Sequence, residues 1–212
     1  MKIAVIGASG RAGSLITKEA LDRGHEVTAI VRDRRKLHGN VAKILEKDLF
    51  DLTYEDLKGN DVVVDAFGTW TEETLHLHEE SIRHLCGILA NKPIRLIVVG
   101  GAGSLYVNPQ RTMRLMDTPD FPDSYKPVAR HMAAAFDTLR QRSDVKWTYI
   151  SPSADFVPDG PRSGRYVMGW EELLVDNRGE SKISYADYAI AVVDEAERGS
   201  HVCQRFTVIS CY

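Results

Sequence analysis

Three glycines, each three residues after the last, follow the first apolar run of the chain and limit its fold more than any other feature. Gly7, Gly10 and Gly13 come directly after the apolar run at residues 2–6, and a helical pattern starts at Ala12. The first glycine permits a tight turn off a strand, the second lets the backbone approach a pyrophosphate, and the third lets the helix pack closely on the sheet. Because a second strand pattern follows, we predict a dinucleotide site here rather than a purely structural turn.

Short apolar runs rich in β-branched residues alternate with helical patterns along the 212 residues. We expect strands at residues 2–6, 26–31, 42–46, 61–66, 94–99, 146–150 and 205–210, and helices at residues 12–22, 71–89, 127–142 and 186–198. Ser184 is a suitable N-cap for the last helix. This alternation is typical of a parallel sheet with helices on both faces. We therefore predict an α/β fold over residues 1–212: a single doubly wound parallel-sheet Rossmann domain with a small C-terminal substrate-side region.

Composition and charge disfavour several other classes of protein. The net charge is −3 and no stripe of lysine and arginine is present, so no nucleic-acid partner is expected. No run of 18 apolar residues predicts a membrane span, and the start of the chain does not resemble a signal peptide, so we expect a cytoplasmic protein. Cys86, Cys203 and Cys211 are odd in number and include no C-x-x-C pair, which indicates reduced thiols.

The loops after the strands define the expected ligand site, because ligands of doubly wound sheets bind beyond the carboxyl ends of the strands. The nucleotide site is expected mainly within residues 1–110, and the irregular, Pro- and Gly-rich loop at residues 151–170 is expected on the substrate side. There Arg162, Arg165, Tyr166 and Trp170 could cover a flat, anionic acceptor. The residues predicted to hold the pyrophosphate are Gly7, Ser9, Gly10, Arg11, Ala12 and Gly13.

The residue after the second strand bears on the choice of cofactor. Enzymes that use NAD usually place an acidic residue there, whereas this chain has Arg32, whose guanidinium suits the 2′-phosphate of NADP. Arg11 and Arg35 could add positive charge. We predict NADP, and NAD remains the alternative if the strand ends one residue later and Asp33 binds the ribose.

Further along the chain, three short segments are expected beside the cofactor. Asp48 and Leu49 would lie near the adenine, with a simple capping role for Asp48 as the alternative interpretation. Ala66, Phe67 and Gly68 would form a wall along the adenosine. Gly100 and Gly101 would let the flat nicotinamide ring approach the backbone.

Several motifs together resemble one known family. They are GASGRAG at residues 7–13, GGAGSL at 100–105, SPS at 151–153, ISYADYA at 183–189 and RFT at 205–207. They are similar to those of the atypical short-chain dehydrogenase/reductases, and within them to the group labelled NADH-flavin reductases, which is related to biliverdin reductase B. The resemblance spans nearly the whole chain and implies an NAD(P)-binding Rossmann fold.

The resemblance also implies roles for residues near the nicotinamide. Ser104 falls where the superfamily places its catalytic serine, although it could equally be a turn hydroxyl. Ser151, Pro152, Ser153 and Phe156 correspond to the wall on the nicotinamide side.

The chain departs from the superfamily at the Tyr-x-x-x-Lys pair that ordinarily reduces carbonyls. Tyr125 is followed four residues later by Ala129, and Tyr106 by Gln110, so neither tyrosine has its lysine. Sugar epimerases among the relatives usually depend on the same pair, which disfavours that activity as well.

Two functions remain open. The first is an NAD(P)H-dependent oxidoreductase that passes a hydride to a flat acceptor such as a flavin or quinone, since no tuned acid is obligatory for that reaction. The second is a non-catalytic regulatory protein that senses NADP. No metal site is predicted: His76, Glu80 and His84 share a helical spacing, but a solvated helix face explains it.

Overall fold

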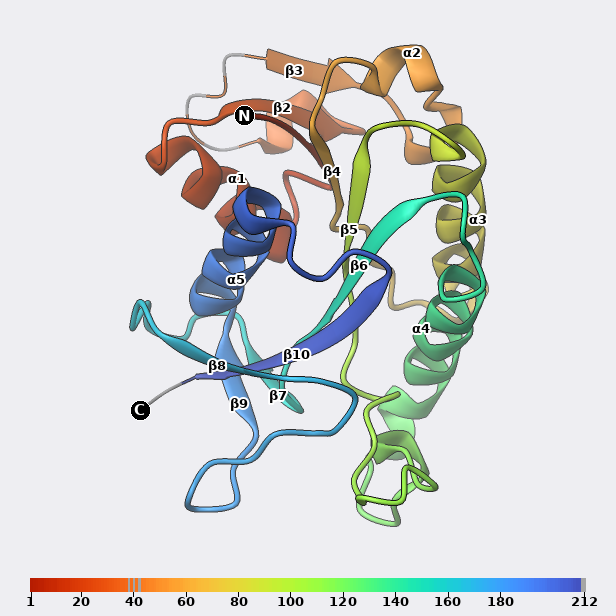
Figure 1. The fold of residues 1–212 in the computed structure, drawn as a ribbon, viewed down its shortest axis with the longest axis vertical. Coiled ribbons are helices and arrows are strands. Elements are labelled where there is room, and N and C mark those ends of the chain that lie inside the picture. Colours follow the sequence, from red (N-terminus) through yellow and green to blue (C-terminus); the bar gives the residue numbers. More distant parts are fainter. Residues whose placement is uncertain (38, 40, 42, 211–212) are drawn as a thin grey trace.

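An eight-stranded, mostly parallel sheet forms the centre of the molecule (Figure 1). The structure is a computed structural model that describes residues 1–37, 39, 41 and 43–210. In spatial order the strands are β3 (Lys43–Glu46), β2 (Glu26–Val31), β1 (Lys2–Ile6), β4 (Val62–Asp65), β5 (Arg95–Val99), β6 (Lys146–Ser151), β10 (Gln204–Ser210) and β8 (Tyr166–Gly169). Strands β7 (Asp155–Val157) and β9 (Lys182–Ser184) pair separately in a small two-stranded sheet.

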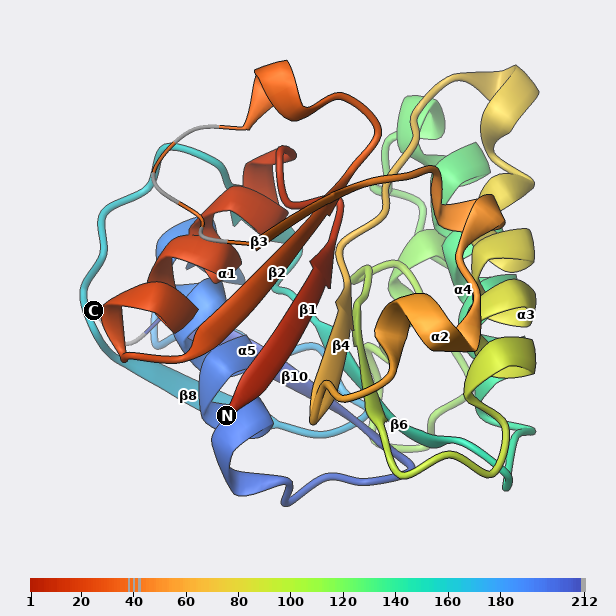
Figure 2. The same ribbon diagram turned by 90° about the horizontal axis from the view of Figure 1, so that it is seen from above.

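Helices cover both faces of this sheet, as the view from above shows (Figure 2). On one face lie α1 (Arg11–Asp22) and α5 (Tyr185–Arg198), and on the other lie α2 (Tyr54–Leu57), α3 (Leu77–Leu89) and α4 (Lys126–Leu139). The central strands, such as β1 and β4, have continuous apolar sequences, as expected of strands that are buried on both faces. The predicted doubly wound α/β fold is therefore confirmed.

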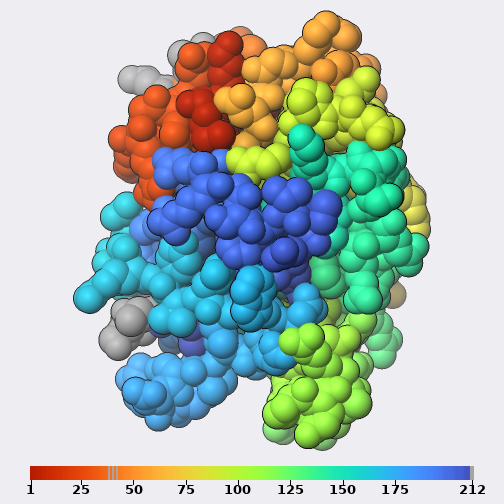
Figure 3. Space-filling model, viewed as in Figure 1, coloured from red at the N-terminus to blue at the C-terminus, as the bar shows by residue number. Residues whose placement is uncertain are grey.

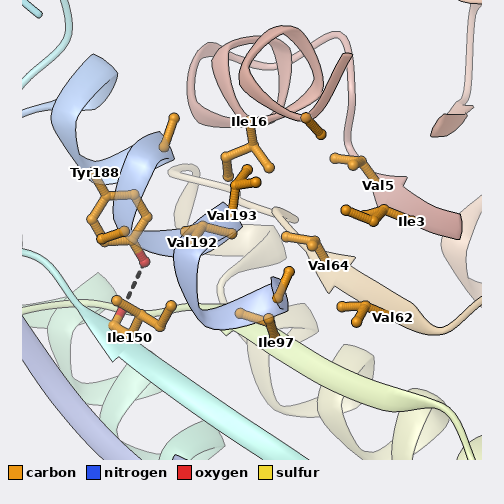
Figure 4. Packing of buried hydrophobic residues seen from close by; sticks show 14 of the residues in the cluster. Ile3, Val5, Ile16, Val62, Val64, Ile97, Ile150, Tyr188, Val192 and Val193 are labelled. Atoms are coloured by element: carbon orange, nitrogen blue, oxygen red, sulfur yellow. Dashed lines mark hydrogen bonds between the residues drawn. The ribbon is translucent and has the colours of Figure 1, made fainter. Parts of the chain in front are cut away.

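Each face of the sheet has its own hydrophobic core. On the side of α1 and α5, Ile16 and Val192 pack against alternate residues of the strands, among them Val5 and Val64 (Figure 4). Tyr188 of α5 is fully buried and its hydroxyl donates a hydrogen bond of 2.7 Å to the carbonyl oxygen of Ile150. This contact attaches α5 to the end of β6, beside the loops that would hold a ligand.

The sequence predicted most element positions but not all of the topology. All seven predicted strands are present, with their ends within two residues of those expected. Residue 42, the expected start of the third strand, lies outside the described residues, and so does Cys211. Ser184 caps α5, accepting a hydrogen bond of 3.0 Å from the Asp187 N–H. The expected irregular loop instead contains β7 and β8, and β8 pairs antiparallel with β10. Its apolar run, Tyr166 to Met168, is only three residues long and lies between Gly164 and Gly169, so the sequence did not mark it as a strand.

None of the helices in the described ranges is both long enough and apolar enough to cross a membrane.

Candidate functional site

The glycine turn after β1 has no room for side chains. Gly7 has a φ of 73°, in the left-handed region, and a Cβ there would lie 2.8 Å from the carbonyl oxygen of Ala66. A Cβ on Gly13 would lie 2.2 Å from the carbonyl oxygen of Gly7, so α1 can approach β1 this closely only with glycine. The Gly10 N–H closes the turn with a bond of 2.8 Å to the same oxygen. The mechanical roles predicted for Gly7 and Gly13 are those that the structure shows.

The first turn of α1 is open toward a negatively charged ligand. Gly10 is the N-cap and has no side chain to bond the first amides, and no acidic residue occupies the first turn. The first hydrogen bond of the helix runs from the Ser14 N–H to the Gly10 carbonyl oxygen. The N–H groups of residues 11–13 therefore have no acceptor within the helix and can bind a ligand. These amides and the helix dipole are the ordinary elements of a pyrophosphate site. The turn therefore fits a dinucleotide, with Ser9, Arg11 and Ala12 beside it as predicted contacts.

The loop after β2 contains the charged residues on which the choice between NADP and NAD depends. Asp33 accepts two bonds from the Arg35 guanidinium, at 2.9 and 3.0 Å, and a third from the Arg35 N–H. The Arg35 guanidinium holds the pKa of Asp33 below its ordinary value. Arg32 is exposed and makes no hydrogen bond or ion pair with any residue in the described ranges. Asp33 and Arg35 are thus paired with each other, and a contact of Arg32 with the 2′-phosphate of NADP stays a prediction.

The segment after β3 adopts the capping arrangement that its sequence allowed. Asp48 is the N-cap of the short 3-10 turn Leu49–Asp51, and its Oδ1 accepts a bond of 3.0 Å from the Phe50 N–H. The Leu49 side chain is buried in the core on the side of α3. A contact of either residue with adenine stays a prediction.

A buried carboxyl group that the sequence did not single out lies at the end of β4. Asp65 is 3% exposed, and its Oδ1 accepts a bond of 3.0 Å from the Phe67 N–H. Burial raises the pKa of Asp65 to about 6, although this hydrogen bond acts in the opposite direction. The bond shapes the turn at Ala66 and Phe67, whose backbone lies against Gly7. The predicted adenosine wall therefore stands directly beside the glycine turn, with Gly68 following it.

The glycines after β5 accommodate the protein's own side chains. A Cβ on Gly100 would lie 2.2 Å from the Tyr149 ring, and one on Gly101 would lie 3.0 Å from the sulfur of Met132. The Gly101 N–H also donates to the Tyr149 hydroxyl at 3.1 Å. The explanation that these glycines leave space for a flat ring is thus incomplete, because their open faces are filled from β6 and α4. Contact of Gly100 and Gly101 with nicotinamide stays a prediction.

Ser104 is a buried member of a charged network. It is 4% exposed, and its hydroxyl accepts a bond of 2.8 Å from Nη1 of Arg205, which also donates to the Ser104 carbonyl oxygen at 3.3 Å. Arg205 in turn forms an ion pair with Glu171 and stacks on the Phe136 ring, 4.5 Å from its centroid. This geometry favours the turn-hydroxyl interpretation of Ser104, and its catalytic role stays a prediction.

The last residue of β6 and the two residues that follow it are buried. Ser151, Pro152 and Ser153 are all buried, and the Ser153 hydroxyl donates a bond of 2.8 Å to the carbonyl oxygen of Val208. Phe156 packs against Tyr185, the first residue of α5, with 3.8 Å between ring centroids. Ser153 therefore secures this loop to β10, and a contact of the loop with nicotinamide stays a prediction.

The roles expected of the loop at residues 151–170 are wrong for three of its side chains. The Arg162 guanidinium bonds to Glu19 of α1 at 3.0 Å, and the Tyr166 hydroxyl donates to Asp194 of α5 at 2.9 Å. Trp170 packs against the ring of His201, near the amino end of β10. These side chains attach the loop to α1, α5 and the far side of the sheet. They do not gather at the carboxyl ends of the strands.

Two exposed aromatic residues lie on loops at that end instead: Trp70, which no sequence pattern marked, and Tyr125, which was considered only for the Tyr-x-x-x-Lys pair. Trp70 follows β4 and is 67% exposed, and Tyr125 directly precedes α4 and is 53% exposed. Their rings meet edge to face with 6.4 Å between centroids. Exposed large aromatic residues on loops next to strand ends could have raised this expectation, but only the fold brings the two together.

The helical histidines have ordinary partners. His84 bonds to the carbonyl oxygen of Leu52 at 3.0 Å, and exposed His76 lies 3.8 Å from exposed Glu80. In the described ranges, no group of three or more metal-binding side chains comes together.

Comparison with known families agrees with this geometry. A family model described as NAD(P)H-binding matches residues 7–197. The chain belongs to this NAD(P)H-binding family. The match begins at the first glycine of the turn after β1 and reaches the last turn of α5.

Individual relatives of the NAD(P)H-binding chain carry different descriptions. An uncharacterized Bacillus subtilis protein, YwnB, is 52% identical over 211 residues, 99% of both chains. A crystal structure from Streptococcus pneumoniae, described as a "putative NADH-flavin reductase", is 48% identical, covers all of both chains and has a TM-score of 0.96. Another, from Bacteroides thetaiotaomicron, is described as a "putative epimerase"; it is 36% identical, with a TM-score of 0.88, and the match covers 100% of this chain and 97% of that one. These likenesses support the cofactor class more strongly than the reaction.

Proposed function

We propose that the protein is an NADPH-dependent reductase that transfers a hydride to a flat redox acceptor such as a flavin or quinone. The use of a nicotinamide cofactor is supported by the glycine turn and the open first turn of α1, in a chain of the NAD(P)H-binding family. The choice of a flavin or quinone as the acceptor is supported by the description of the S. pneumoniae relative and by the missing Tyr-x-x-x-Lys pair.

In this proposal the chain's own residues bind and orient the two reactants. The amides at the start of α1 hold the pyrophosphate, and the exposed Arg32 pairs with the 2′-phosphate. Bound NADPH supplies the hydride, and the acceptor takes up one proton from water to complete its two-electron reduction. No residue of the chain is required as a strong acid, which agrees with the lack of a tyrosine–lysine pair.

Trp70 and Tyr125 are the proposed stacking surface for the acceptor. Together they expose two adjacent aromatic rings at the carboxyl end of the sheet. A contiguous exposed apolar patch on a protein surface often marks a binding site. Stacking of a flat ring on an aromatic side chain adds about 0.5–1.5 kcal/mol to burial of its area. This assignment replaces the one that the sequence suggested for Tyr166 and Trp170.

The direct test of the reaction is the decrease in reduced-nicotinamide absorbance with FMN, FAD, riboflavin and small quinones supplied in turn. We expect at least one to accelerate NADPH oxidation well above the enzyme-free rate. Trp70→Ala should then raise KM for that acceptor about tenfold with NADPH affinity unchanged, and Trp70→Phe should restore most of the loss. Tight NADPH binding with no acceptor accelerated, together with a protein partner that binds only one cofactor redox state, would support the NADP-sensing alternative.

The cofactor preference has a separate test by titration calorimetry with NADPH and NADH. A charge-assisted contact contributes about 1.5–3 kcal/mol, so NADPH should bind roughly ten- to a hundredfold more tightly. Arg32→Ala should remove most of this difference, whereas Arg178→Ala, on an exposed turn elsewhere, should leave it unchanged. Equal affinities of the parent protein for both cofactors would show that the proposed role of Arg32 is wrong.

A further inference from the structure

A pocket of about 540 Å³ is lined by residues of α4, β6, β10 and the segments that follow β5 and β8. Trp147 is the second residue of β6, and Cys203 directly precedes β10, so the pocket adjoins the amino ends of these strands. The glycine turn and Arg32 lie beyond the carboxyl ends of β1 and β2. This pocket is therefore separate from the nucleotide site, and its volume is typical of small-molecule sites.

Two chain segments and one helix enclose the pocket. The Tyr106 N–H donates to the Glu171 carbonyl at 2.9 Å, and the Leu173 N–H donates back to the Tyr106 carbonyl at 2.8 Å, which joins the two segments into one wall. Phe136 of α4 and Arg140, the C-cap that follows this helix, also line the pocket. Figure 3 shows the face on which residues near 140, 170 and 204 meet.

Four aromatic residues are among those that line this pocket. The rings of buried Phe136 and Trp147 meet edge to face, with 6.3 Å between their centroids. Trp170 is 50% exposed. Tyr106 lies half-buried beside them. The exposed ring of Trp170 is therefore the surface in this pocket on which a flat ring can stack.

The charges around the pocket favour an anion. Its lining contains three arginines and a single carboxylate, Glu171, which is already paired with Arg205. Arg140 is about half-exposed, and its contact with Asp137 is long, at 3.6 Å. Arg111, also half-exposed, is paired with Glu172 at 2.6 Å. Arg140 is thus the cation best able to accept a new partner.

The buried guanidinium beneath the pocket has an unsatisfied donor. The Arg205 side chain is 1% exposed, and among the described residues its Nε has no hydrogen-bond partner. A buried donor without a partner costs about 1–3 kcal/mol, and such groups are uncommon in folded proteins. The charge of Arg205 is already paired with Glu171, so the positive charge that a ligand can reach in this pocket comes from Arg140.

We propose that this pocket is a second binding site, for a small molecule that consists of a flat aromatic ring bearing a carboxylate. The ring stacks on Trp170, and the carboxylate pairs with Arg140 at the edge of the pocket. The site does not depend on the proposed reductase activity, because none of its residues belongs to the nucleotide or acceptor surfaces.

The test uses 1-naphthoate as the probe, with its uncharged analogue 1-naphthamide, by titration calorimetry in saturating NADPH. We expect one naphthoate per chain to bind saturably below about 1 mM, and naphthamide to bind at least tenfold more weakly. Quenching of tryptophan fluorescence should follow the same isotherm, since Trp147 and Trp170 both line the pocket.

Three variants locate the bound probe. Arg140→Ala should weaken naphthoate binding about tenfold and leave naphthamide unchanged, and Trp170→Ala should weaken both about fivefold. Arg198→Ala is the matched control, because Arg198 also ends a helix and pairs with an aspartate one turn earlier but lies on α5, outside the pocket. It should change neither affinity. Absence of saturable binding, or naphthoate binding equal to the parent's in folded Arg140→Ala and Trp170→Ala proteins, would overturn the proposal.

Discussion

Replacing Asp65 by asparagine should make the protein more stable at neutral and alkaline pH. Its carboxyl group is buried at the end of β4 with one hydrogen bond, from the Phe67 N–H. Burial raises its pKa from 3.8 to about 6, because the charged form is poorly solvated there. An asparagine keeps an oxygen for the Phe67 N–H and carries no charge at any pH.

The size and the sign of the effect follow from this shift. The folded state holds the proton of Asp65 more tightly than the unfolded state does. This tighter binding adds to the free energy of unfolding in full below pH 3.8, and the added stability is lost as the pH rises through about 6. A shift of about two units at about 1.4 kcal/mol per unit gives an upper limit of about 3 kcal/mol. Relative to the parent, Asp65→Asn should therefore gain about 2–3 kcal/mol in free energy of unfolding between pH 4 and pH 8.

Urea unfolding of both proteins at pH 4, 5.5, 7 and 8 measures this gain. Any cost of fitting the amide group is independent of pH and cancels when values at two pH values are compared. Asp120→Asn, at an exposed aspartate, is the control and should show no gain of this size. A difference between Asp65→Asn and the parent that is the same at pH 4 and pH 8 would refute the reasoning.

Three further substitutions test other parts of the structure. Gly13→Ala should abolish NADPH binding or prevent folding, as followed by calorimetry and circular dichroism, because its Cβ would lie 2.2 Å from a backbone oxygen; normal binding would contradict this geometry. Ser104→Ala should lower the free energy of unfolding by about 1–2 kcal/mol through loss of the acceptor for Arg205, with NADPH affinity unchanged; a more than tenfold loss of turnover at unchanged stability would instead support a catalytic serine. Tyr188→Phe should cost about 1 kcal/mol in urea unfolding, and no cost would show that its buried hydroxyl is satisfied without that bond.

Local sequence patterns predicted the parts of the fold that depend on neighbouring residues. The apolar runs marked β1 and β2 with their exact ends, and the spacing of Gly7 and Gly13 marked the turn between β1 and α1. Ser184 was identified as an N-cap because capping involves residues only three apart. In each case the physical cause lies within a few residues of the signal.

Contacts between distant segments could not be inferred in this way. Ser104 and Arg205 are 101 positions apart, and nothing near Ser104 indicates that a guanidinium occupies its hydroxyl. The Tyr149 ring that fills the open face of Gly100 belongs to another strand. The sequence around Gly100 therefore indicated only a glycine that a ligand could approach. The burial of Asp65 likewise results from packing against α3 and α4, whose positions the sequence pattern alone does not specify.

The order of the last strands has a consequence for how the chain folds. β8 precedes β10 in the sequence, yet β10 lies between β6 and β8 in the sheet. During synthesis β8 is therefore made before its only partner in the described sheet, and it must wait with both edges unpaired until β10 follows. Proteins dominated by such non-local pairings fold slowly, and unpaired strand edges promote aggregation. We expect the segment around β8 to be the last part of the sheet to become protected as the chain emerges from the ribosome.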